Sequence, residues 1–161
     1  MSELVYIGLG SNLGNSEQHL LLAFEALEKL SLTLSFKRSS LYRSAPMGPQ
    51  DQNDYLNAVA EFKCDLPPIE LLDQLQSIEQ QHDRKRQGER WGPRTLDLDL
   101  LLYGNKAIDL PRLKVPHYGL KERNFVLLPL FELAPNLELP DGTGVAQLLE
   151  NIGQHGIEKI A

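Results

Sequence analysis

The sequence predicts an α+β fold: a ferredoxin-like βαββαβ core with an antiparallel sheet, followed by additional C-terminal helices and short strands. The main observation is that the hydrophobic pattern alternates between the strand period and the helix period in that order up to about residue 104. The length of 161 residues suits a single domain covering residues 1–161. In this topology both core helices pack on one face of the sheet.

The N-terminal part of the pattern predicts a strand, a helix and a second strand. Residues 4–9 form a short apolar run typical of a buried strand. Asn15 or Ser16 can cap a helix over residues 17–30, and residues 32–42 read as the second strand. The proline-containing loop after it, SAPMGPQDQND, has a length typical of functional loops.

The clearest alternation lies in residues 55–64, which predict a strand with two different faces. The core face should carry Leu56, Ala58, Ala60, Phe62 and Cys64, and the other face Tyr55, Asn57, Val59, Glu61 and Lys63. A helix is expected from Pro67 or Pro68 to about His82, then a strand over residues 95–104. Two further helices are expected over residues 125–133 and 145–151.

Composition and charge exclude several classes of protein. The net charge of −6 argues against a nucleic-acid-binding protein, which needs a positive field. Cys64 is the single cysteine, so no intramolecular disulfide can form, and a reducing cytoplasm is the expected location. The sequence start reads as a strand instead of a signal peptide, and no apolar run is long enough to span a membrane.

Asp97 and Asp99 are the strongest candidates for a metal site. In a strand they point to the same side, while Leu96, Leu98, Leu100 and Leu102 point to the other side, into the core. Their Cα atoms should be roughly 6.7 Å apart, and their repulsion about 2–2.5 kcal/mol at an effective dielectric of 20. A divalent cation such as Mg²⁺, which prefers carboxylate and phosphate oxygens, would offset that cost. The alternative is a half-exposed strand whose polar face happens to be acidic.

An arginine-rich loop leads directly into this strand. Its basic residues are Arg84, Lys85, Arg86, Arg90 and Arg94. Guanidinium groups that bind phosphate oxygens and carboxylates that hold Mg²⁺ are together what phosphoryl transfer requires. Trp91, between two glycines of the loop, could cover a flat ligand. The alternative is a solvated basic loop.

Familiar nucleotide and metal motifs are absent from the sequence. The segment GLGSNLG carries Leu13 where the dinucleotide fingerprint needs its third glycine. No G-x-x-x-x-G-K-[ST] motif and no protein-kinase motif set occurs, and the four histidines do not combine with Cys64 at zinc-binding spacing.

Four segments resemble the 6-hydroxymethyl-7,8-dihydropterin pyrophosphokinase family over residues 5–142. They are GSNLG, GPQDQNDYLNA, RWGPRTLDLDL and VPHYGLKERNFVLLPLFELAP. The resemblance implies that pyrophosphate moves from ATP to the hydroxymethyl oxygen of the pterin, leaving AMP, in folate synthesis. It also implies two Mg²⁺ ions on Asp97 and Asp99, small-molecule substrates only, and a monomer.

The resemblance also assigns residues to each part of the site. Catalytic roles fall to Arg84, Arg94, Asp97 and Asp99. Pterin contacts fall to Ser44, Ala45, Met47, Tyr55, Asn57, Trp91 and Phe125. ATP contacts fall to Gln76, Glu79, Arg84, Trp91, Arg94, Leu100, Arg112, His117, Tyr118 and Arg123.

Some of these residues have simpler interpretations. Periodicity alone favours core packing for Phe125. A solvated helix face is the alternative for Gln76 and Glu79, and without the resemblance His117, which follows Pro116, would be an ordinary turn histidine. Two rival functions are a Mg²⁺-dependent phosphohydrolase or nuclease using the same aspartates, and an RNA-binding module on a ferredoxin-like sheet. The first would need no pterin, and the second would need exposed sheet aromatics and a basic face.

Overall fold

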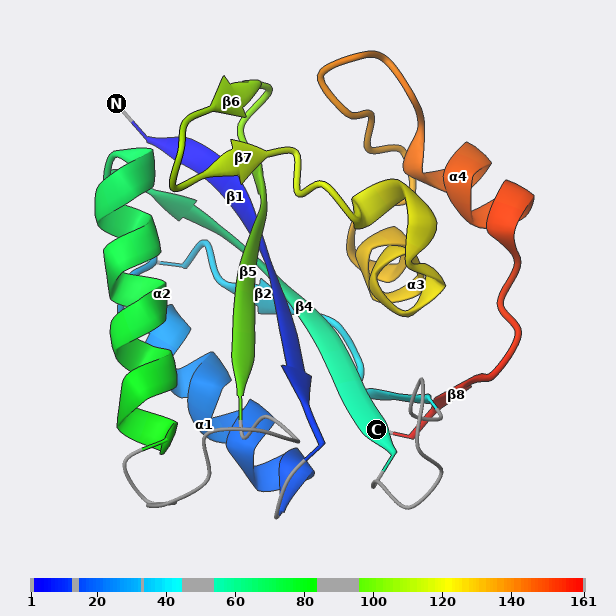
Figure 1. Ribbon diagram of the computed structural model, residues 1–161, viewed down its shortest axis with the longest axis horizontal. Helices are drawn as coiled ribbons and strands as arrows, with labels where there is room; N and C mark the ends of the chain where they lie inside the picture. Colours follow the sequence, from blue (N-terminus) through cyan, green and yellow to red (C-terminus); the bar gives the residue numbers. More distant parts are fainter. Residues whose placement is uncertain (1, 13–14, 33, 45–53, 84–95, 161) are drawn as a thin grey trace.

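The computed structural model describes residues 2–12, 15–32, 34–44, 54–83 and 96–160. Its elements follow the predicted order and continue into a C-terminal region of short elements (Figure 1). They are β1 (Glu3–Ser11), α1 (Ser16–Glu28), β2 (Lys37–Arg38), β3 (Tyr42–Ser44), β4 (Tyr55–Cys64), α2 (Pro68–Asp83), β5 (Asp97–Tyr103), β6 (Ile108–Asp109), β7 (Lys114–Val115), the 3-10 turn η1 (Leu120–Glu122), α3 (Asn124–Leu133), α4 (Val145–Ile152) and β8 (Ile157–Lys159). Of the two predicted caps for α1, Asn15 is the one used: its side chain accepts a hydrogen bond from the N–H of Gln18 at 3.2 Å.

The main sheet has the strand order β5-β1-β4-β3-β8, and β2 also pairs with β4. All of its strand pairs are antiparallel, which confirms the predicted fold class. Strand β1 lies between β4 and β5, so that Gly10 is opposite both Asn57 and Asp97, and Gly8 is opposite both Val59 and Asp99. This register brings the acidic strand and the predicted pterin strand to either side of two glycines.

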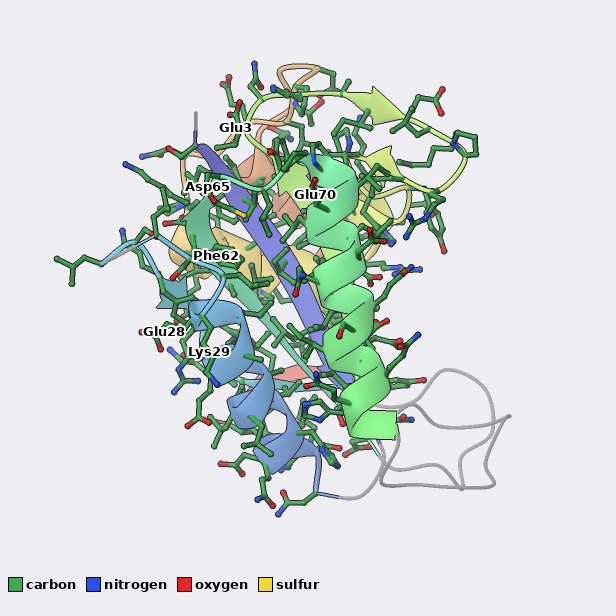
Figure 2. All side chains as sticks on the ribbon, turned by 90° about the vertical axis from the view of Figure 1, so that its left-hand side faces the viewer. Glu3, Glu28, Lys29, Phe62, Asp65 and Glu70 are labelled. Carbon is green, nitrogen blue, oxygen red and sulfur yellow. The ribbon has the colours of Figure 1, made fainter. Side chains whose placement is uncertain are left out.

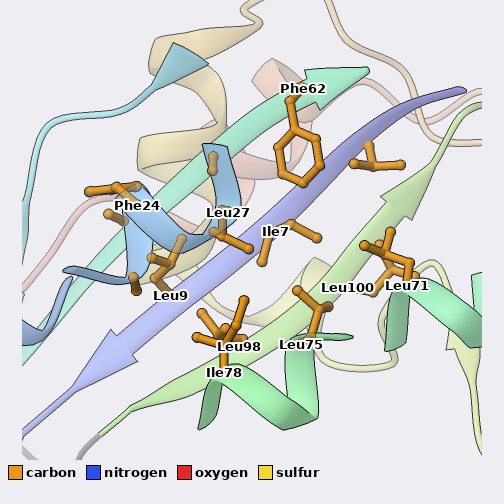
Figure 3. Packing of buried hydrophobic residues seen from close by; sticks show 14 of the residues in the cluster. Ile7, Leu9, Phe24, Leu27, Phe62, Leu71, Leu75, Ile78, Leu98 and Leu100 are labelled. Atoms are coloured by element: carbon orange, nitrogen blue, oxygen red, sulfur yellow. The ribbon is translucent and has the colours of Figure 1, made fainter. Parts of the chain in front are cut away.

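Helices α1 and α2 lie side by side over one face of the sheet (Figure 2). The α1–α2 core beneath them is apolar, and Ile7, Leu27, Phe62 and Leu75 in it are fully buried (Figure 3). All five residues predicted for the core face of β4 belong to this core, so that prediction is confirmed.

Helices α3 and α4 lie over the opposite face and form a second core, the α3–α4 core (Figure 1). It contains Tyr6, Val59 and Leu102 from the sheet and Leu127 and Leu130 from α3. The face of β4 that was expected to lie away from the core is therefore buried over Asn57, Val59 and Glu61, because α3 covers it.

The predicted strand over residues 32–42 is wrong in its extent. Both the N–H and the hydroxyl of Ser35 donate to the Leu32 carbonyl, and Leu34 has a φ of 64°, so the chain turns there. The strand begins only at β2 and stops again at Ser39, whose hydroxyl accepts the N–H of Val59 at 2.9 Å. In the segment that links β2 to β3, this side-chain hydrogen bond to β4 thus takes the place of a backbone ladder bond.

The prediction that Leu102 joins the same core as Leu100 is also wrong. Leu100 pairs with Ile7 and Leu102 with Tyr6, which leaves Leu101 as an extra residue in β5. This bulge reverses the alternation, so Leu102 enters the α3–α4 core and Tyr103 the α1–α2 core. Over the described ranges, no helix is both long enough and apolar enough to cross a membrane.

Candidate active site

The two aspartates of β5 lie on the sheet face opposite α1 and α2, here called the site face. Leu98, between the two aspartates, and Leu100, directly after them, are buried in the α1–α2 core. Because side chains alternate along a strand, Asp97 and Asp99 point to the other side. Because Gly8 and Gly10 of β1 have no side chains, nothing on β1 stands between the aspartates and the facing residues of β4. Side chains of the flanking strands reach over these glycines instead: Leu101 of β5 lies over Gly8, and the amide of Asn57 lies over Gly10.

His117 lies beside Asp99 at the end of the β7 segment. Its Nε2 is 3.8 Å from Asp99 Oδ1, and its backbone N–H donates to the Leu101 carbonyl at 3.1 Å. The N–H of Gly119 donates to Nδ1 at 3.1 Å, so the neutral ring carries its proton on Nε2, toward Asp99. Burial lowers the pKa of His117, because it disfavours the charged ring. The negative charge of Asp99 raises this pKa and the positive charge of Arg123 lowers it, and the net result is a lowered pKa.

Tyr118 and Arg123 extend the site from His117 toward solvent. The rings of His117 and Tyr118 stack with centroids 4.5 Å apart, and the Arg123 guanidinium lies 5.6 Å from the Tyr118 ring centroid. Tyr118 is 79% exposed, which is unusual for a large aromatic side chain. The structure thus groups three of the predicted ATP residues next to Asp99, with a flat ring and a cation available to a ligand.

The predicted ATP residues on α2 lie along the free edge of β5. Glu79 Oε2 accepts a hydrogen bond from the N–H of Leu98 at 2.6 Å. Leu98 lies between Asp97 and Asp99 in the sequence. Gln76 Oε1 accepts from Arg112 Nη2 at 3.1 Å. The side chain of Leu100 is buried in the α1–α2 core, so only its backbone groups remain available to a ligand.

Sequence reasoning missed Asp73, which accepts from Arg112 Nη2 at 2.6 Å. Asp73 lies three residues before Gln76 on the same side of α2. That spacing was the only signal in the sequence, because Arg112 is distant along the chain.

Three of the described residues predicted to contact the pterin, Ser44, Tyr55 and Asn57, lie at the adjoining ends of β3 and β4. Ser44 pairs with Tyr55, and two residues further along β4 Asn57 is only 8% exposed. Its Nδ2 donates to the Leu9 carbonyl at 3.4 Å, whereas its buried Oδ1 has no hydrogen-bond partner within the described part of the chain. An unpaired buried acceptor is costly unless a ligand or water completes it.

Phe125 lies in the first turn of α3 and is half-buried. Its neighbours Val126 and Leu128 pack against the α3–α4 core, whereas Phe125 belongs to neither core. The interpretation from periodicity, that Phe125 is a core residue, is therefore not supported. Its role as a pterin contact stays a prediction.

Five predicted site residues lie outside the described residues. They are Ala45, Met47, Arg84, Trp91 and Arg94. The other basic residues of the arginine loop, Lys85, Arg86 and Arg90, also lie outside them.

Comparison with known proteins identifies the family. Residues 6–135 match the model of the 7,8-dihydro-6-hydroxymethylpterin-pyrophosphokinase (HPPK) family. The chain belongs to this family. Two HPPK relatives named 2-amino-4-hydroxy-6-hydroxymethyldihydropteridine pyrophosphokinase are similar over almost their whole length. The one from Pseudomonas aeruginosa is 49% identical over 99% of this chain and 98% of its own. The one from Haemophilus influenzae is 48% identical over 96% of both chains.

Solved structures agree with the HPPK fold. The wild-type Plasmodium falciparum HPPK-DHPS with pteroate has a TM-score of 0.74 at 13% identity and matches 99% of this chain. The present chain spans 46% of that longer protein. At this identity the similarity supports the fold alone.

Proposed function

We propose that the site face is where this chain carries out the reaction of its family. The chain is a pyrophosphokinase that transfers pyrophosphate from ATP to 6-hydroxymethyl-7,8-dihydropterin, giving AMP and the pterin diphosphate in tetrahydrofolate biosynthesis. The observation that carries the proposal is the match over residues 6–135. It is supported by Asp97 and Asp99 lying on one sheet face across two glycines from Asn57.

Asp97 and Asp99 would hold two Mg²⁺ ions. The donors fit this metal, because they are carboxylate oxygens on one side of a strand and Asp99 is 45% exposed, so that substrate phosphates can complete the coordination. Bound magnesium supplies neutralisation of the charge on the ATP phosphates. Arg84 and Arg94 are proposed to add positive charge to the same phosphates.

On the pterin side, Asn57 would accept a hydrogen bond from the ring edge through the Oδ1 that is unpaired in the described structure. Tyr55 and Phe125 would stack on the ring, and the loop that starts at Ser44 would contribute further contacts. Ala45, Met47 and Trp91 are also proposed to contact the pterin.

On the ATP side, the proposal places the nucleotide between the free edge of β5 and the cluster of His117, Tyr118 and Arg123. Gln76, Glu79 and Arg112, together with the backbone of Leu100, would contact it along α2 and β5. Catalysis would then depend mainly on positioning the two substrates and on stabilising developing negative charge. We also propose that the enzyme acts as a cytoplasmic monomer.

The test is the identity of the nucleotide product after incubation with ATP, Mg²⁺ and the hydroxymethyl dihydropterin. AMP formed only when the pterin is present supports pyrophosphoryl transfer. ADP would indicate a simple kinase instead. Phosphate released without the pterin would favour the rival Mg²⁺-dependent phosphohydrolase.

A further inference from the structure

We infer that Glu132 is a positioning residue for the pterin pocket, because it joins the helix that carries Phe125 to the strand beside Asn57. The inference rests on the proposed function and adds a residue that is not among the predicted site residues. Glu132 lies in the last turn of α3, and its partners lie about 90 positions earlier in the chain.

The carboxylate of Glu132 accepts hydrogen bonds from three donors, two on Ser40 just before β3 and one on Tyr42, the first residue of β3. Tyr42 donates its hydroxyl to Oε1 at 2.6 Å. Ser40 donates its N–H at 3.0 Å to Oε1 and 3.1 Å to Oε2, and its hydroxyl to Oε2 at 3.0 Å. Charge-assisted bonds to a single short segment fix both the position and the rotation of the helix end.

On α3, Glu132 follows Phe125 by seven residues. Seven residues of an α-helix make almost two full turns, so the two side chains share one side of α3. This side meets the sheet at Tyr42 through the bond to Glu132. The direction in which Phe125 points therefore depends on the same helix orientation that Glu132 holds.

On the sheet, Tyr42 is the direct partner of Asn57 in the antiparallel pairing of β3 with β4. Side chains of directly opposed residues lie next to each other on the same face. Glu132 thus fixes the neighbour of Asn57 on one side and the helix of Phe125 on the other. Loss of this carboxylate should disturb both predicted walls of the pterin pocket and leave the Asp99–His117 side in place.

The test compares Glu132→Ala, Glu132→Gln and Tyr42→Phe with the wild type. Glu138→Ala, a change at an exposed glutamate beyond α3, is the matched control. The measurements are kcat, the KM for each substrate, the pterin Kd by calorimetry, and Tm. Glu132→Ala should raise the KM and Kd for the pterin about tenfold, with the KM for ATP changed less than twofold.

Glu132→Gln keeps an oxygen acceptor for Tyr42 and Ser40, so it should recover most of the pterin affinity. Tyr42→Phe removes one hydrogen bond only and should raise the pterin Kd about threefold. If Glu132→Ala does not fold, the pterin Kd of Tyr42→Phe tests the inference in its place.

An equal rise of both KM values, or a lowered Tm with an unchanged pterin Kd, would overturn the inference. Unchanged constants in the variants of an active wild type would refute this inference alone. A wild type that neither binds the pterin nor forms AMP would refute the proposed function and this inference with it.

Discussion

At the scale of single residues, Gly10 controls the position of Asn57. A Cβ atom built on Gly10 would lie 3.0 Å from Asn57 Nδ2, which is tighter than ordinary van der Waals contact. The amide can yield only by rotating away from the Leu9 carbonyl that it now contacts. Glycine is therefore needed at position 10 to leave room for the amide of Asn57, and not only for the backbone flexibility that glycine gives.

We predict that Gly10→Ala weakens pterin binding several-fold while the fold is kept. The reason is the displaced amide of Asn57, whose net hydrogen-bond contribution is on the order of 1 kcal/mol. Calorimetric titration with the pterin measures it. Gly144→Ala is the control, because nothing lies within 4 Å of the added Cβ atom there. Equal affinity in both variants would contradict the prediction.

Removing one of the two neighbouring carboxylates, Asp97 or Asp99, should preserve or raise stability but lower activity. Replacing Asp99 by Asn removes repulsion between neighbouring carboxylates, so Tm should stay the same or rise. Pyrophosphoryl transfer should fall by about a hundredfold or more, since a metal-binding charge is lost. Asp65→Asn, at an exposed position after β4, should leave both unchanged. An Asp99→Asn enzyme with near wild-type kcat/KM would exclude the proposed metal role.

At the scale of elements, the attachment of α3 should depend on pH through Glu132. Burial alone would raise the pKa of Glu132, but hydrogen bonds from Tyr42 and Ser40 lower it below its ordinary value. A carboxyl group with a lowered folded pKa stabilises the fold above its unfolded pKa, about 4.3. That stabilisation is lost as the pH falls through the folded pKa.

The prediction is that the difference in unfolding free energy between wild type and Glu132→Gln shrinks below about pH 4. Urea titrations followed by circular dichroism from pH 7 to pH 3 measure this difference. The Glu138→Gln variant corrects for general effects of acid on the fold. Parallel pH curves for wild type and Glu132→Gln would show that the carboxylate charge contributes nothing.

Elements with strong periodicity could be predicted closely, and those governed by single side chains could not. The limits of β4 are those predicted, because its alternation runs through ten residues. The hydroxyls of Ser35 and Ser39 interrupt the expected second strand, and a bulge at Leu101 redirects Leu102. Neither effect changes the hydrophobic pattern on which the prediction was based.

The site was predictable in part, for a similar reason. The common side of Asp97 and Asp99 follows from the strand period alone. The contacts of Asp73 and Glu132 depend on residues about 40 and 90 positions away, which no local pattern contains. The second core was missed because α3 is apolar on most sides, so its sequence does not indicate which side meets the sheet.

At the scale of the whole molecule, one sheet serves two cores. The α1–α2 core and the α3–α4 core share β1, β4 and β5, and each of these strands directs residues to both sides. A change in either core therefore acts on the strands that position the site. We expect the two cores to unfold together.

The test is a pair of cavity-forming variants, Leu75→Ala in one core and Leu130→Ala in the other. Each should lower the free energy of unfolding by about 2–5 kcal/mol with a single transition. Leu21→Ala, at an exposed position of α1, should change it little. Two separate transitions in either variant would show that the halves are independent.

The bond from Glu79 to Leu98 has a consequence for association between molecules. β5 is the last strand on its side of the sheet, and an outward-pointing N–H there could pair with a strand of a neighbouring molecule. Glu79 already occupies the N–H of Leu98 and brings a negative charge to this border. The strand that carries Asp97 and Asp99 is thereby protected at this N–H against edge-to-edge pairing, which leads to insoluble aggregates.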